Sequence, residues 1–122
     1  YENEADILSR VQELLDEPES LKERKKAQEF NKSGITAFEQ GNLNEAIEAF
    51  EAALRHTPKH AALNLNIVQV ITKSFKKTQD PLLLKLAKES LDRIRHIPKQ
   101  HNQFKRMNHL KSVINKLSDK KA

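Results

Sequence analysis

The segment Ala27–His60 reads AQEFNKSGITAFEQGNLNEAIEAFEAALRHTPKH. Apolar and small residues recur in two runs at spacings of three and four, which is the period of one face of an α-helix. Between the runs, Gly41 can adopt the left-handed conformation that ends a helix, and Asn42 or Asn44 can cap the next helix. Pro58 closes the segment, because the residue before a proline avoids helical angles. The segment therefore predicts a hairpin of two helices.

Two small residues indicate where these helices approach each other. Gly34 lies in the middle of the first helix, where glycine costs about 1 kcal/mol relative to alanine. Nothing local requires a glycine there, so we expect close approach by the second helix. Ala46 is the predicted neighbour, since a helical hairpin brings these two positions together.

This pattern resembles one tetratricopeptide repeat, a helix–turn–helix unit of about 34 residues. The motif positions that the segment retains are Phe30 (usually Trp), Gly34, Ala46, Phe50, Ala53 and Pro58. Two positions depart from the motif, with Ser33 where Leu is usual and Ala37 where Tyr is usual. The resemblance implies an all-α, solenoid-like array of antiparallel helices that serves as a scaffold for binding other proteins.

Similar patterns outside the segment predict further helices. Two of them form a second, divergent repeat, and one further helix is added at each end of the chain, which makes six helices in all. The predicted helices cover residues 3–16, about 20–40, from the cap at Asn42 or Asn44 to the residue before Pro58, from residue 61 to the boundary at residues 79–81, 81–97 and about 101–118. We expect residues 1–19 to form an N-terminal helix and linker, residues 20–118 the repeat-like domain, and residues 119–122 a disordered tail.

Composition narrows the classes of function. The chain has no Cys and only two Gly, so it offers no thiolate, no Cys-based zinc site and no glycine-rich phosphate loop. His56 and His60 straddle Pro58, and His96 and His101 straddle Pro98, so neither pair keeps helical spacing for a metal. No nucleophile is paired with a base. We therefore predict no enzyme activity, no metal and no cofactor. No apolar run approaches the ~20 residues of a membrane span, and we expect a cytoplasmic protein.

Charge is unevenly distributed along the chain. Residues 1–60 hold 8 Lys/Arg against 13 Asp/Glu, and residues 61–122 hold 14 against 4. The basic half fits an acidic protein or peptide partner. Nucleic acid is the alternative, because a basic face can neutralise phosphates, but no aromatic stacking platform accompanies it. Head-to-tail association of two copies also stays open.

The resemblance also implies where a partner would bind. In arrays of this kind the first helix of each repeat lines a concave groove. The groove residues implied here are Asn31, Ile35, Phe38, Leu65, Asn66, Gln69 and Lys73. Asn31, Asn66 and Gln69 are polar without a role in capping or in the core pattern, so we expect them either to contact a ligand or to face solvent.

A narrower resemblance covers the whole chain. It is similar to the C-terminal repeat domain of certain bacterial response regulators, on the stretches Leu15–Glu17, Ala27–Asn31, Ala62–Asn66 and Leu91–Arg93. That resemblance implies an output or adaptor module of two-component signal transduction, with a phosphoryl-accepting receiver domain upstream of Tyr1.

Overall fold

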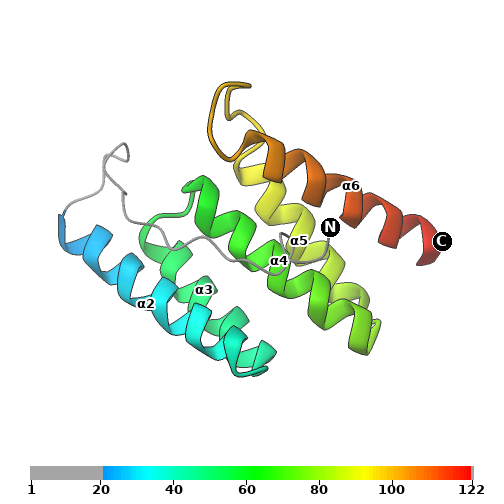
Figure 1. The fold of residues 1–122 in the computed structure, drawn as a ribbon, viewed down its shortest axis with the longest axis horizontal. Helices are drawn as coiled ribbons and strands as arrows, with labels where there is room; N and C mark the ends of the chain where they lie inside the picture. The colour runs from blue at the N-terminus through cyan, green and yellow to red at the C-terminus, as the bar shows by residue number, and fades with distance from the viewer. Residues whose placement is uncertain (1–20, 122) are drawn as a thin grey trace.

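A computed structural model describes residues 21–121 (Figure 1). These residues form helices and no strand, which confirms the prediction of an all-α chain. The helix predicted over residues 3–16 lies outside the described residues. The helices are α2 (Leu21–Glu39), α3 (Leu43–His56), α4 (Ala61–Thr78), α5 (Pro81–Arg93) and α6 (Phe104–Lys121).

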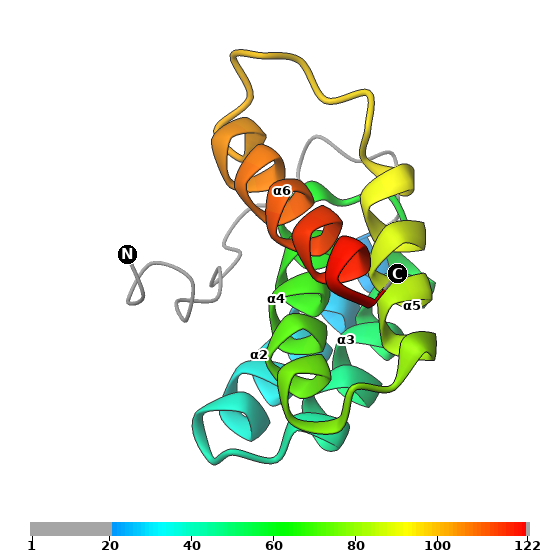
Figure 2. The ribbon, with the colours of Figure 1, turned by 90° about the vertical axis from the view of Figure 1, so that its right-hand side faces the viewer.

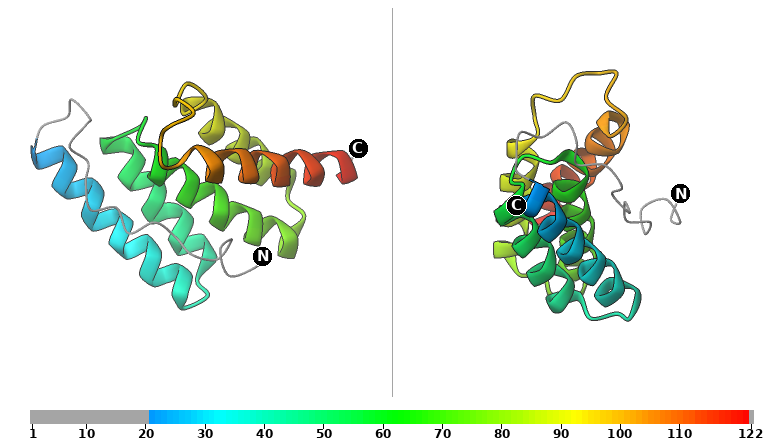
Figure 3. Two further views of the ribbon diagram at one scale, coloured as in Figure 1. Left: turned by 45° about the horizontal axis from the view of Figure 1, so that its top comes forward. Right: turned by 90° about the vertical axis from the view of Figure 1, so that its left-hand side faces the viewer.

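Each helix packs against the next one along the chain, and α4 also contacts α6. Viewed from the end, α2, α4 and the start of α6 follow one another on one side, and α3 and α5 lie on the other (Figure 2). Figure 3 shows the same stacking from two further directions. Every residue of α4 from Ala61 to Thr72 is buried, so this helix is the centre of the core. Apolar residues lie nearly all round its first half, with Asn64, Asn66 and Gln69 between them, and a helix that is apolar on most sides is buried.

The hairpin of α2 and α3 has the predicted boundaries, but its close contact differs from the prediction. A Cβ atom on Gly34 would lie 2.6 Å from Cε1 and 2.7 Å from Cζ of Phe50. The aromatic ring of Phe50 therefore occupies the space that the missing side chain leaves, and the three atoms nearest to that position all belong to this ring. Both Phe50 and Ala46 are fully buried.

Local signals explain most helix ends. Gly41 has a φ of +81° and ends α2 as predicted. Asn42 occupies the N-cap position of α3, although its side chain makes no capping hydrogen bond. Asp80 caps α5, because its carboxylate accepts from the backbone N–H of Leu82, and Pro81 takes the first helical position.

Two C-terminal boundaries differ from the sequence prediction. α5 ends at Arg93 rather than near Ile97. The chain continues there in tighter turns, in which Ile94 N–H donates to the carbonyl of Leu91 and Arg95 N–H to the carbonyl of Asp92. α6 extends to Lys121, past the predicted end at residue 118. Residues 119–121 contain no Gly or Pro, so nothing in the local sequence ends the helix at Ser118.

Candidate functional site

A cluster of amide side chains surrounds one arginine where α2, α4 and α6 meet. Asn66 Nδ2 donates to Asn31 Oδ1 at 2.9 Å. Arg106 Nη2 donates to Asn66 Oδ1 at 2.8 Å, and Arg106 Nε donates to Gln69 Oε1 at 3.0 Å. Arg106 Nη1 reaches Gln103 Oε1 at 3.2 Å. We call these five residues the amide cluster.

The partners of Arg106 are unusual for a largely buried guanidinium. Within residues 21–121 its hydrogen bonds all go to neutral amide oxygens, and no carboxylate of these residues lies within ion-pair distance. Burial lowers the pKa of Arg106 to about 10, so the group remains charged at neutral pH. A buried charge without a counter-ion costs free energy that neutral hydrogen bonds offset only in part. The amide cluster therefore holds a positive charge at a site that a negatively charged group would complement.

The structure brings together most of the residues that the sequence places in a groove, but it buries them. Asn31 is 4 % exposed, Asn66 0 % and Gln69 5 %. These amides do not face solvent, so the expectation that they are solvent-facing residues is wrong. Ile35 and Leu65 belong to the hydrophobic core. The assignment of these residues to partner binding stays a prediction.

The other two predicted groove residues form a pair at the edge of the same face. Phe38 is half-buried and Lys73 is exposed. The ammonium of Lys73 lies 5.2 Å from the centre of the Phe38 ring, a cation–π contact worth ~0.5–1 kcal/mol at an exposed site. Lys73 therefore adds a second positive charge to the α4 face that carries Asn66 and Gln69.

Sequence reasoning places Arg106 on a basic surface and misses its position in the amide cluster. A signal is present in the spacing, because Gln103, Arg106, Met107 and Leu110 follow one another at intervals of three, one and three. Met107 and Leu110 are buried, so this spacing directs Arg106 toward the same side of α6. The residues around Arg106 are mostly basic, so the sequence alone favours an exposed arginine over a buried one.

His56 has a packing role within the described region. His56 Nδ1 lies 2.5 Å from Glu23 Oε2, and its ring stacks on Phe30 with centroids 5.9 Å apart. These contacts join the end of α3 to α2. Phe30 is one of the positions at which the chain resembles the repeat motif. Within residues 21–121, no three His, Cys, Asp or Glu side chains gather at a distance suited to a metal ion.

Comparisons with protein-family models, curated proteins and solved structures find no match for this chain. Within residues 21–121, no helix combines the length and apolar character needed to cross a membrane.

Proposed function

We propose that this chain is a protein-interaction scaffold of the tetratricopeptide-repeat type, and that its partner presents an acidic, extended segment. The surface assigned to the partner is the face of α2, α4 and α6 that carries Phe38, Lys73 and the accessible edge of Arg106. The observation that carries the proposal is the charge on this face. Neither cation forms an ion pair with a carboxylate of the described residues.

Carboxylates on a partner would supply what this face lacks. A bound carboxylate can accept hydrogen bonds from a guanidinium fork or an ammonium group, and such charge-assisted bonds are about twice as strong as neutral ones. Complementary charge also accelerates encounter and rejects partners of the wrong sign. The half-buried ring of Phe38 offers an apolar contact beside Lys73. An acidic segment with an interspersed apolar residue fits these features.

Lys73→Glu is expected to remove partner capture while leaving the fold intact. Lys73 is exposed, and its ammonium contacts the ring of Phe38, so the substitution costs little stability but reverses the local charge. The measurement is affinity capture from native lysate, followed by identification of the retained proteins. Lys88→Glu is the matched control, because Lys88 is also exposed and carries the same charge, but it belongs to α5 rather than to the face assigned to the partner.

If the chain instead binds nucleic acid, the wild-type protein and the two variants should behave differently. Binding to phosphates weakens steeply as salt increases, in proportion to the number of phosphates contacted. Under our proposal, wild-type protein binds RNA and DNA only weakly and non-specifically at physiological salt. Micromolar or tighter binding, reduced equally by Lys73→Glu and Lys88→Glu, would favour the nucleic-acid alternative.

The role of output or adaptor module in a two-component system is part of the same proposal. It rests on the resemblance to the repeat domain of bacterial response regulators. The reading frame upstream of Tyr1 tests it, because a receiver domain with an acidic phosphorylation pocket should be encoded there.

A further inference from the structure

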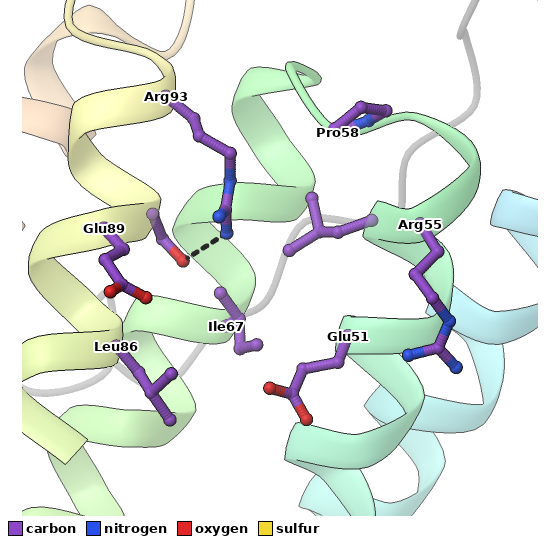
Figure 4. Close-up of a pocket in the computed structure, with 9 residues that line it drawn as sticks. Glu51, Arg55, Pro58, Ile67, Leu86, Glu89 and Arg93 are labelled. Carbon is purple, nitrogen blue, oxygen red and sulfur yellow. Dashed lines mark hydrogen bonds between the residues drawn. The ribbon is translucent and has the colours of Figure 1, made fainter. Parts of the chain in front are cut away.

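A groove of about 440 Å³ lies between α3 and α5, with α4 at its base (Figure 4). It shares no residue with the amide cluster. Leu54, Ile67 and Leu86 provide its apolar surface. Charged residues border it on both sides: Glu51 and Arg55 come from α3, Glu89 and Arg93 from α5. We call this site the outer groove.

The charges on its two borders are arranged in matching order. In each helix an acid precedes a base by four residues, which is one helical turn. Figure 4 shows both arginines toward the end of the groove near Pro58 and both glutamates farther from it. Glu–Arg pairs at this spacing commonly form ion pairs. Here none of the four charges has an ion-pair partner within the described region.

A buried asparagine holds Arg93 at the groove. Asn64 is 0 % exposed, and its Nδ2 donates to the carbonyls of Pro58 and His60, both at 2.9 Å. With the amide orientation set in this way, Asn64 Oδ1 accepts from Arg93 Nε at 2.9 Å. Arg93 Nη2 also donates to Ser90 Oγ at 2.8 Å. Arg93 is therefore positioned before any partner arrives, which lowers the entropy cost of binding to it.

The apolar surface of the groove continues along α5. Leu82, Leu86, Glu89 and Arg93 follow one another at spacings of four, three and four, so they share one face of the helix. Leu82 is 64 % exposed, an unusually large exposed fraction for a leucine in this fold. From Leu82 to Arg93 the face extends about 16 Å at 1.5 Å per residue. That length matches three turns of a partner helix.

We propose that the outer groove binds one amphipathic α-helix of a partner protein. An acidic side chain of that helix would lie beside Arg55 and Arg93, and a basic side chain one turn later would lie beside Glu51 and Glu89. Apolar side chains in the following turns would cover Leu86 and Leu82. Because α3 and α5 run in the same direction, a partner antiparallel to them places its N-terminus at the arginine end. Helix dipoles favour this direction, and acids are favoured in the first turn of a helix.

A helix fits the groove better than an extended peptide. Side chains of one helix pack into the space between two others. An extended segment leaves its backbone N–H and C=O groups to be satisfied by water or by polar groups of the surface that it covers. The apolar floor of the outer groove, formed by Leu54, Ile67 and Leu86, offers no polar side chain to an extended chain that lies along it. This surface is distinct from the face assigned to the acidic segment.

The test is selection of a phage-displayed library of helical 15-residue peptides on the wild-type protein. Enriched peptides should carry an acid, a base four residues later, and apolar residues in the following two turns. Their affinity should fall about ten-fold or more for the double variant Glu51→Arg/Arg55→Glu, because like charges then face each other. Leu82→Lys should weaken binding similarly. These substitutions lie at or beside the groove rim, and circular dichroism melting checks that each variant folds.

Two controls separate this inference from the proposed function. Lys88→Glu alters an exposed charge of α5 that does not line the outer groove, and it should leave peptide affinity unchanged. Lys73→Glu should also leave it unchanged, although it removes capture of the acidic segment. The inference is overturned if no peptide is enriched, if enriched peptides lack the acid–base–apolar order, or if they bind the double variant as tightly as wild type. Competition by a second copy of the chain would likewise overturn it.

Discussion

Replacing Phe50 with alanine is expected to lower the free energy of unfolding by about 3–5 kcal/mol, the range for deleting a buried aromatic side chain. Phe50 is 0 % exposed, and its ring lies directly over Gly34 on the neighbouring helix. The substitution leaves a cavity at the contact that joins α2 to α3. Urea denaturation followed by circular dichroism measures the change, and an unchanged slope would show that the denatured state is unaffected.

The contact between Phe50 and Gly34 can be tested more specifically by combining substitutions at both positions. Gly34→Ala should lower the free energy of unfolding by about 1–3 kcal/mol in the wild-type protein, because the added methyl group overlaps the ring. In the Phe50→Ala protein the same substitution should be stabilising, since alanine is the better helix former by about 1 kcal/mol. Equal effects in the two backgrounds would contradict the assigned contact. Phe38→Ala, at a half-buried position, is the control for loss of a phenyl ring.

Arg106→Lys is expected to lower the free energy of unfolding by about 1–3 kcal/mol, although the charge is retained. The guanidinium fork donates to both Asn66 and Gln69. A single ammonium group at the end of a flexible chain does not reproduce that planar arrangement. At least one buried amide oxygen then loses its donor, and such a loss costs about 1–3 kcal/mol. Thermal and urea denaturation both report this effect.

Arg95→Lys is the matched control for Arg106→Lys. Arg95 is exposed, and its side chain donates a hydrogen bond to the ring of the neighbouring His96. A surface substitution of this kind changes stability by about 0.5 kcal/mol at most. Similar stabilities for the two variants would mean that the amide cluster contributes no more to folding than a surface arginine does.

Local chemistry accounts for the parts of the fold that the sequence predicts well. Gly41 permits the left-handed conformation that ends α2, and the Asp80–Pro81 pair starts α5 at the predicted residue. Helical periodicity also places Phe50 and Ala46 in the core. These features depend on neighbours within about one helical turn, so the residue order alone is sufficient to specify them.

Predictions about contacts between residues far apart in the sequence were less accurate. Periodicity groups residues on one face of a helix, but it does not say which element covers that face. Asn31 and Asn66 are 35 residues apart, and Gln69 and Arg106 are 37 apart. Their hydrogen bonds form only after α2, α4 and α6 have packed together.

Which residue contacts Gly34 also depends on how distant parts of the chain pack. The helical hairpin and the need for a small residue are properties of the sequence, whereas the rotation and separation of the two helices decide whether Ala46 or Phe50 fills the space. Likewise, the four charges that border the outer groove appear in sequence as ordinary helical Glu–Arg pairs. Only packing of α3 and α5 over α4 places them around one apolar surface, because side-chain burial and long-range contacts are set by the whole assembly of helices.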